Sequence, residues 1–431
     1  MTDVLIQKHR LADIDPAPLV HRARGVDPEV VQAASLIFEH VRRDRDGALR
    51  ELTKRFDGAD LEDPFLSRED WDAGAEACPP AVRDAIRGNL ERIRAFHARQ
   101  VGGEDVVEVA PGVTLGRRPV PYDAVGCYVP GGRASYPSSV LMTVLPAVLA
   151  GVPRIVVATP PRRDGSIDVA VLFAAREAGA THVLRAGGAQ AIAALTLGTP
   201  AVPAVDAIVG PGNAYVTAAK RMSAEVVHTD APAGPSELLV LADQTARPRP
   251  IALDLVAQAE HDPDAQVLLV TDHAPLADAV AAELEALVPA AARREVVEAS
   301  LRDHGLLLVA DDWDAACSFA ERYAAEHLEI HSRDPRADMA RVRRAGSVFL
   351  GPHSPVPLGD YGSGTNHVLP TMGFARLRGG LSVDDFRTWV TWQEVTPEGL
   401  AAIGDDVAVL ADAEGLHGHA EAVRARMEGR A

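Results

Sequence analysis

The sequence predicts an α/β protein built from two Rossmann-like doubly wound lobes, each a parallel sheet covered by helices. Short β-branched runs alternate with Ala-rich helical runs over residues 124–209, which predicts successive βαβ units. A second series of the same kind occupies residues 237–350. Glycines follow the expected strands of the first series, as in open α/β sheets whose ligands bind beyond the carboxyl ends of the strands.

The expected elements follow from these patterns in chain order. The first hundred residues are expected to form helices, with breaks at 13–18 and 57–68 where proline and aspartate gather. In the first series we expect strands at 124–129, 154–159, 182–185 and 207–209, and helices at 138–150, 169–178 and 189–197. In the second we expect strands at 237–241, 266–271, 305–309, 328–331 and 347–350, with helical stretches between them.

The last fifty residues predict an arm. From residue 381 a short strand-like piece leads into a helix at 397–427. This segment is too thin to bury a core of its own. We therefore expect it to pack on another lobe or on another subunit.

The overall composition describes an ordinary soluble chain with two or three domains. Its 431 residues are 47% hydrophobic and 24% charged, and a domain typically takes ~150 residues. The net charge of −18 argues against nucleic acid or an anionic membrane as the main partner, since both would repel an acidic protein. Small molecules and other proteins remain as partners.

Cysteine usage and the apolar windows predict a cytoplasmic protein. Cys78, Cys127 and Cys317 are odd in number and far apart, which suggests a reducing compartment and argues against a disulfide framework. Residues 1–29 carry many charges and no apolar signal-peptide core. The most apolar window, 140–158, is interrupted by prolines and an arginine and falls short of the ~20 residues that a membrane span needs.

Gln258 and His261 form a candidate metal half-site. They end the apolar helical run 251–257 and stand three residues apart, which places both side chains on one helical face. A carboxamide oxygen and an imidazole nitrogen make a mixed site of the kind that Zn²⁺ or Mn²⁺ accepts. Further candidate ligands are Glu326, His327, Asp360, His417 and His419. Each of these side chains, taken singly, is also explained as a helix cap or a surface polar group.

Three glycine turns of the first series suggest a nucleotide site. They lie at 130–132, 186–190 and 210–213, each before a helical run. Glycine lets backbone N–H groups approach a phosphate at a helix N-terminus, although such turns also need glycine for steric reasons. The Gly-x-Gly-x-x-Gly fingerprint of dinucleotide-binding folds, with its later ribose-binding acid, is absent. A dinucleotide would therefore bind through a non-standard turn.

Glu326 and His327 offer two neighbouring bases of different strength. Imidazole titrates near neutral pH, where it can take a proton from an alcohol or water. His327 and His331 have the spacing of a zinc protease helix, but the glutamate that should follow the first histidine directly is missing. No Cys-x-x-Cys pair exists to complete a zinc deaminase site around Glu329.

In combination, eight ordered motifs resemble the histidinol dehydrogenase family over most of the chain. They are YVPGGR (128–133), GGAQ (187–190), GPGN (210–213), DAPAGPSE (230–237), QAEH (258–261), EHLEI (326–330), GDYGSGTNH (359–367) and EGLHGH (414–419). The set is far more specific than any one of its members. The first hundred residues carry little of the resemblance.

The resemblance implies a set of site residues. It implies Zn²⁺ held by Gln258, His261, Asp360 and His419, ligands that also lie against the substrate. It implies NAD contacts from Tyr128, Gln190 and Asn213. It implies substrate contacts from Ser236, His327, His367 and Glu414. In the family's intertwined homodimer, His419 and Glu414 are shared across the interface, which accounts for the thin C-terminal arm.

The resemblance also implies the chemistry and the division of the chain. L-histidinol is oxidised through histidinal to L-histidine with two NAD⁺; His327 accepts the alcohol proton and Glu326 activates the water that hydrates the aldehyde. The implied parts are an N-terminal arm (1–24), a large lobe with the metal and catalytic residues (25–127 and 237–380), a second lobe on the NAD side (128–236) and a C-terminal arm (381–431).

Three alternatives remain at this point. A paralogous zinc and NAD dehydrogenase would keep the metal ligands and oxidise another small polyol or amino alcohol, although Ser236, His367 and Glu414 favour histidinol. A metal-dependent hydrolase would use Glu326 to activate a zinc-bound water and would need no NAD. A non-catalytic nucleotide-binding or scaffold protein would leave the acid, base and ligand set unexplained.

Overall fold

The computed structural model describes residues 5–22, 27–131, 135–232 and 234–428. The chain forms two compact units, which we call the main unit (Met1–Ala98 and Asp123–Phe386) and the smaller unit (Arg99–Tyr122 and Arg387–Ala431). Parts of the motifs at 128–133 and 230–237 fall at residues 132, 133 and 233, outside the described residues.

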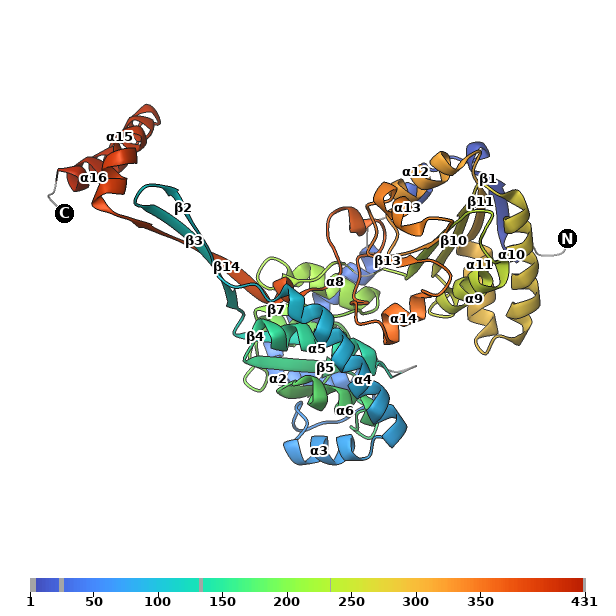
Figure 1. Cartoon of the computed structure of the whole chain (residues 1–431). Helices are drawn as coiled ribbons and strands as arrows, with labels where there is room; N and C mark the ends of the chain where they lie inside the picture. The colour runs from blue at the N-terminus through green and yellow to red at the C-terminus, as the bar shows by residue number, and fades with distance from the viewer. Residues whose placement is uncertain (1–4, 23–26, 132–134, 233, 429–431) are drawn as a thin grey trace. The chain divides into compact units, whose positions relative to one another are not determined.

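The main unit contains a six-stranded parallel sheet with the order β1-β11-β10-β9-β12-β13 (Figure 1). Its strands are β1 (Gln7–Arg10), β9 (Glu237–Ala242), β10 (Gln266–Thr271), β11 (Gly305–Val309), β12 (His327–His331) and β13 (Ser347–Leu350). Its helices are α9 (Pro248–Ala259), α10 (Ala274–Leu287), α11 (Arg294–His304), α12 (Trp313–Tyr323), α13 (Pro335–Arg341) and α14 (Val356–Tyr361). Alternate residues of β9 enter two separate buried cores, one on each face. The prediction of a doubly wound sheet is confirmed here.

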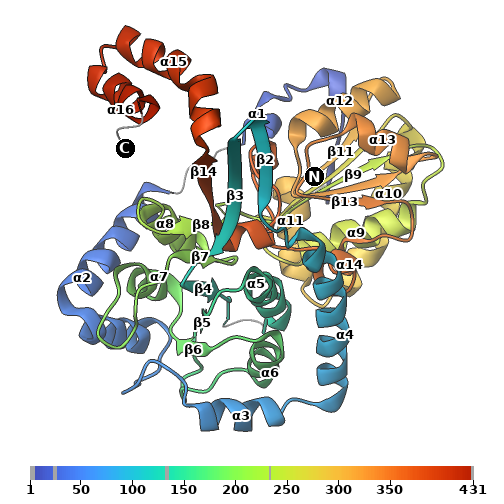
Figure 2. The ribbon, with the colours of Figure 1, turned by 60° about the vertical axis from the view of Figure 1, so that its left-hand side comes forward.

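A second parallel sheet of the main unit has the order β6-β5-β4-β7-β8. Its strands are β4 (Ala124–Tyr128), β5 (Arg154–Thr159), β6 (His182–Arg185), β7 (Ala207–Val209) and β8 (His228–Thr229). Helices α7 (Gly188–Leu197) and α8 (Ala214–Ser223) cover one face, and α5 (Pro137–Ala150) and α6 (Val169–Ala178) cover the other (Figure 2). The alternation of strand and helix matches the predicted βαβ series.

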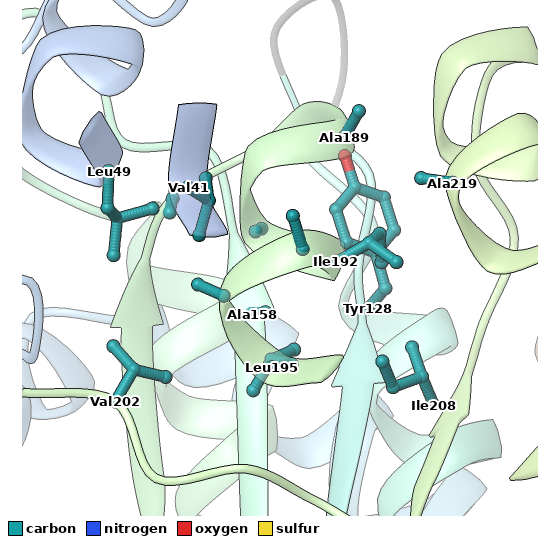
Figure 3. Packing of buried hydrophobic residues seen from close by; sticks show 14 of the residues in the cluster. Val41, Leu49, Tyr128, Ala158, Ala189, Ile192, Leu195, Val202, Ile208 and Ala219 are labelled. Carbon is teal, nitrogen blue, oxygen red and sulfur yellow. The ribbon is translucent and has the colours of Figure 1, made fainter. Parts of the chain in front are cut away.

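Three N-terminal helices pack on this five-stranded sheet's helices. They are α2 (Pro28–Phe56), α3 (Arg68–Glu76) and α4 (Pro80–His97). Val41 and Leu49 of α2 share a core with Ile192 and Leu195 of α7 (Figure 3). Trp71 of α3 donates its indole N–H to the carbonyl of residue 172 in α6 at 2.9 Å.

This packing differs from the expected division, which joined residues 25–127 to the lobe of residues 237–380. Strand β4 and helices α2 to α4 instead complete the layer around the five-stranded sheet. The spacing of apolar residues in an amphipathic helix predicts that one face is buried. It does not predict which sheet that face packs against. The N-terminal segment also differs from the expected helices, because β1 pairs in parallel with β11 before α1 (Ala17–Val20) begins.

The smaller unit consists of an antiparallel sheet and two helices. Its strands β2 (Asp105–Ala110), β3 (Val113–Pro121) and β14 (Arg387–Val395) have the order β14-β3-β2. The single helix expected at 397–427 is two helices, α15 (Pro397–Ala413) and α16 (His417–Met427). The break falls at Gly415, whose φ of +77° is a left-handed conformation that glycine adopts without strain.

Short 3-10 helices occur at Leu11–Asp13, Ala98–Gln100, Val288–Ala290, Phe374–Arg376 and Val383–Phe386. Within the described part of the chain, no helix combines the length and the apolar character that crossing a membrane requires.

Candidate active site

Most of the predicted site residues of the main unit line one cleft with a volume of about 600 Å³. The predicted residues among its lining are Asn213, Ser236, Gln258, His261, Glu326, His327, Asp360 and His367. Tyr128 and Gln190 are buried in the five-stranded sheet region and are not among the lining residues. Glu414 and His419 belong to the smaller unit.

The two sheets contribute opposite edges to the cleft. Asn213 lies beyond the carboxyl end of β7 and begins α8. Ser236 and Glu326 instead immediately precede β9 and β12, at the amino ends of these strands. Helix α9 ends just before His261, and α14 ends just after Asp360. The cleft therefore meets a helix N-terminus from one sheet and helix C-termini from the other.

The main chain of Glu237 orients the predicted catalytic pair. The Glu237 N–H donates to Oε2 of Glu326 at 2.8 Å. The Glu237 carbonyl lies 3.0 Å from Nδ1 of His327, so this nitrogen must carry the proton and donate. Nε2 of His327 is then the lone-pair nitrogen, and it has no hydrogen-bond partner among the described residues. His327 thus offers an unpaired acceptor at the lining of the cleft.

Burial shifts the pKa values of the pair in opposite directions. Burial, aided by the nearby His261 and His367, lowers the pKa of His327 to about 4, so its imidazole is neutral at pH 7. Burial raises the pKa of Glu326 well above its ordinary value, and Glu237 and Asp360 add to this rise. Two neighbouring groups whose pKa values are pushed apart are typical of an acid and base pair in an active site.

Gln258, His261 and Asp360 present a donor set that fits a divalent cation. Nε2 of the buried Gln258 has no hydrogen-bond partner among the described residues, and a half-turn of the amide would present Oε1 instead. Burial raises the pKa of Asp360 to about 7, as expected for a carboxylate that lacks a nearby counter-charge. Desolvation lowers the pKa of His261 and so favours the neutral imidazole that binds metals.

The helix ends add to this preference for a cation. His261 and Asp360 lie at the C-terminal ends of α9 and α14, where the helix dipole places partial negative charge. His367 lies in the same part of the cleft, and each of its ring nitrogens has a hydrogen-bond partner. Its Nδ1 lies 3.2 Å from the main-chain carbonyl of Asp360 and its Nε2 3.3 Å from Oγ of Ser139.

The three residues predicted to contact NAD have protein partners of their own. Asn213 caps α8, since its Oδ1 accepts from the N–H of residue 216 at 3.1 Å. The Tyr128 hydroxyl accepts from the N–H of Gly188 at 3.0 Å. Nε2 of Gln190 donates to Oδ2 of Asp57 at 3.3 Å. Of the three, Asn213 alone is among the residues that line the described cleft.

One glycine of these turns has a steric reason to be there. Gly210 has a φ of +115°, and a Cβ at this position would collide with the main-chain carbonyl of Tyr128. Its N–H also donates to Oδ2 of the buried Asp230 at 2.7 Å. This turn needs glycine for packing, so its glycine is not by itself evidence of a phosphate.

Glu414 and His419 are exposed side chains of the smaller unit, at the end of α15 and in the first turn of α16. The same unit exposes apolar side chains, namely Val106, Val107, Val109, Val390, Val395, Val407, Val409, Leu410 and Leu416. A partner that covered these side chains would bury apolar area.

The buried ion pair between Arg22 and Glu237 was not predicted from the sequence. Nε of Arg22 lies 2.9 Å from Oε1 of Glu237, and the guanidinium stacks 3.7 Å above the ring of Tyr323. The N–H of Met372 donates to the same carboxylate at 2.7 Å. The pair anchors the residue that orients Glu326 and His327. A lone arginine 215 positions away from its partner carries no local sequence signal.

A second unpredicted cluster lies outside the lining of the cleft. Ligand-type atoms of Asp254, Glu329 and His331 lie within 4.8 Å of one another. The spacing of Glu329 and His331 on one face of a strand is visible in the sequence. Their proximity to Asp254 is visible only in the fold.

The family model, the sequence relatives and one closely similar solved structure agree on one family. The sequence model of histidinol dehydrogenase matches residues 20–427. The chain is 48% identical to histidinol dehydrogenase of Methanothermobacter thermautotrophicus over 409 residues, which cover 95% of this chain and 96% of that protein. It is 43% identical to histidinol dehydrogenase of Methanosarcina barkeri over 427 residues, 98% of each chain. The crystal structure of histidinol dehydrogenase from Elizabethkingia anophelis matches with a TM-score of 0.95 and 36% identity, covering 100% of this chain and 99% of that one.

Proposed function

The chain belongs to the histidinol dehydrogenase family of oxidoreductases, and from this premise we propose a zinc- and NAD-dependent four-electron oxidation of L-histidinol through L-histidinal to L-histidine. This reaction comprises the last two steps of histidine biosynthesis. The observation that carries the proposal is the unpaired Nε2 of His327 beside a carboxyl group of raised pKa in one cleft.

His327 is the base of the first oxidation. Its Nδ1–H is held by the Glu237 carbonyl, so Nε2 accepts the proton of the substrate hydroxyl while a hydride leaves the carbinol carbon for NAD⁺. An imidazole of low pKa passes that proton on easily. The product of this half-reaction is L-histidinal.

Glu326 is the base of the second oxidation. It removes a proton from the water that adds to the aldehyde, and the hydrated carbon then gives its hydride to a second NAD⁺. A carboxylate of raised pKa is a stronger base than an ordinary one. A divalent cation beside Asp360 would favour the charged form of Glu326 that this role requires.

Gln258, His261 and Asp360 are proposed to hold Zn²⁺, together with His419 of the partner subunit. The bound ion would act as a template that holds the amino and imidazole nitrogens of the substrate. Ser236, His367 and the partner subunit's Glu414 are proposed to contact the substrate, where the Glu414 carboxylate suits an imidazole N–H. Tyr128, Gln190 and Asn213 are proposed to contact NAD.

The shared residues require an intertwined homodimer. Its support is the exposed apolar surface of the smaller unit, which carries both Glu414 and His419. Mixing a His419→Asn variant that does not bind zinc with a Glu326→Gln variant that is impaired in the second oxidation tests the proposal, because heterodimers regain one site that forms L-histidine at the normal rate only if His419 acts across the interface. No recovery after verified subunit exchange would return His419 to the site of its own chain.

The experiment that tests the activity is the stoichiometry of NADH formed per L-histidinol consumed. Two NADH per histidinol, abolished by a chelator and restored by Zn²⁺, is the expected result. Turnover of a different amino alcohol or polyol in place of histidinol would move the substrate to a paralogue. Hydrolytic activity without NAD would overturn the redox proposal.

A further inference from the structure

Asp254, Glu329 and His331 form a buried triad that the proposed chemistry does not use. Glu329 is 0% exposed, His331 5% and Asp254 9%. None of the three is among the residues that line the cleft. Buried polar groups of this kind are costly unless they satisfy one another, so the arrangement calls for a reason.

The Glu329 carboxylate is the centre of the triad and joins three elements. Asp254 of α9 is hydrogen-bonded to it. Its Oε1 accepts from the N–H of Val356, the first residue of α14, at 2.9 Å. Its Oε2 lies 3.2 Å from Nε2 of His331 on its own strand, β12.

Each joined element carries a proposed site residue at a fixed offset from the triad. In α9, Gln258 lies four residues after Asp254 and therefore one turn further along the same face. In α14, Asp360 lies four residues after Val356. In β12, His327 lies two residues before Glu329 and on the same face of the strand. Asp254, Val356 and Glu329 are therefore each one helical turn, or two strand residues, from a proposed metal ligand or from the proposed base.

We propose that Glu329 is a positioning residue that locks α9, α14 and β12 together and thereby sets the zinc affinity of the cleft. The inference rests on the proposed zinc-dependent function. Hydrogen bonds behind a metal site hold its ligands in place, and here they act on the helices that carry Gln258 and Asp360.

The protonation of the triad agrees with this role. Burial, reinforced by the charge of Glu329, raises the pKa of Asp254 to about 8. Asp254 therefore carries a proton at pH 7 and donates it to the Glu329 carboxylate. The proton on Asp254 spares the pair a second buried negative charge and supplies the donor that Glu329 accepts.

The test compares Asp254→Leu with Asp254→Asn. Asparagine keeps an N–H that donates to Glu329, whereas leucine of similar size removes the donor. Zinc dissociation constants of the metal-stripped dimer are measured by competition with a chromophoric chelator, with circular dichroism to confirm folding. We expect Asp254→Leu to weaken zinc binding at least about tenfold and Asp254→Asn to stay within about twofold of the unchanged protein.

Ser300→Ala is the matched control. Ser300 is fully buried in the same lobe and donates to the carbonyl of Ala265 at 2.8 Å. Its loss deletes a buried hydrogen bond between α11 and Ala265, in which Asp254, Glu329 and Val356 take no part. Zinc affinity should not change in this variant. An equal loss in Ser300→Ala and Asp254→Leu would reduce the triad to ordinary stability and overturn the proposal.

Val356→Pro tests the α14 side, also when Asp254→Leu does not fold. Proline is tolerated at the first position of a helix and lacks the N–H that Glu329 accepts. We expect weaker zinc binding in this variant as well. Unchanged affinity in Val356→Pro, a tenfold loss in Asp254→Asn, or a second zinc ion bound at the triad would each contradict the inference.

The two proposals fail in distinguishable ways. If the unchanged protein neither binds zinc nor oxidises histidinol, the proposed function is wrong. If it does both, and Asp254→Leu binds zinc with unchanged affinity, the proposed function stands and the role of the triad is wrong.

Discussion

The two sheets of the main unit meet the cleft with opposite edges and opposite polarity. The five-stranded sheet presents the carboxyl end of β7 and the N-terminus of α8 at Asn213. The six-stranded sheet presents the amino ends of β9 and β12 and the C-termini of α9 and α14. Helix N-termini favour anions and helix C-termini favour cations. The same fold class therefore offers one edge that favours an anion and one that favours a cation.

The two edges also differ in how far they satisfy their own polar atoms. Near the five-stranded sheet, the hydroxyl of Tyr128 and the amide of Gln190 already have protein partners. At the other edge, Nε2 of His327 and Nε2 of Gln258 are buried without partners among the described residues. Leaving a buried polar atom unpaired costs about 1–3 kcal/mol. Unpaired buried nitrogens are therefore better evidence for a ligand site than the glycine turns are.

The largest expected effect tests the edge of the six-stranded sheet, where Nε2 of His327 is unpaired. His327→Asn keeps an N–H that can donate to the Glu237 carbonyl, but it removes the base, so we expect kcat to fall about 10³-fold. Tyr128→Phe is the matched change at the other edge, and we expect it to lower kcat no more than about tenfold. Steady-state kinetics on both variants decide the matter. Equal losses would remove the distinction between the edges.

A somewhat smaller effect separates the two bases of the unpaired edge. Glu326→Gln keeps an oxygen that accepts from the N–H of Glu237 and loses the carboxylate. We expect oxidation of L-histidinal to slow about 10²-fold and oxidation of L-histidinol to histidinal to change much less. Single-turnover measurements with each substrate check this. A normal rate with L-histidinal would show that this carboxylate is not the base for hydration.

Most strands of the two parallel sheets could be predicted from the sequence because their signals are local, whereas the candidate site residues were grouped by the family resemblance. The β-branched run 154–159 coincides with β5, and the helix expected at 169–178 coincides with α6. Gln258 and His261 share a cleft with Glu326 and Asp360, as the motifs implied. Short motifs carry this information because each one holds its side chains on a single turn or strand end.

The remaining features depend on contacts between distant segments. Arg22 pairs with Glu237, and Asp254 meets Glu329, without any repeat or spacing that connects them. The placement of α2 against α7 is likewise decided by which apolar faces fit in three dimensions. The candidate site lies at the amino ends of the strands of the six-stranded sheet. This was also unexpected, since ligands of open α/β sheets usually bind at the carboxyl ends.

A third prediction tests whether Gln190, at the edge of the five-stranded sheet, contacts NAD although it already has a protein partner. Gln190→Ala should raise KM for NAD⁺ about fivefold with little change in kcat, since a single hydrogen bond is worth about 1 kcal/mol. Thr196→Val is the control, because Thr196 is a polar residue of the same helix whose hydroxyl bonds to the carbonyl of Ile192 and to Ser223. If both variants shift KM equally, the effect reports the integrity of α7 and not a cofactor contact.

The last prediction concerns stability at this same edge. Burial raises the pKa of Asp57 to about 6, against the lowering effect of the hydrogen bonds from Gly187 and Gln190. The folded chain therefore binds this proton more tightly than the unfolded chain, and the free energy of unfolding falls as pH rises from about 4 to about 6. Above that window the full penalty of the buried charge is present.

Asp57→Asn removes the penalty and keeps an oxygen for the N–H of Gly187. We expect the free energy of unfolding to rise by up to about 2 kcal/mol at pH 7, with the gain vanishing near pH 4. Urea unfolding at pH values from 4 to 8 measures it. Asp60→Asn is the control of opposite sign, because Lys54 lowers the pKa of that exposed carboxyl and its charge is mildly stabilising. A gain that did not depend on pH would mean that the carboxylate of Asp57 is not the strained element of this edge.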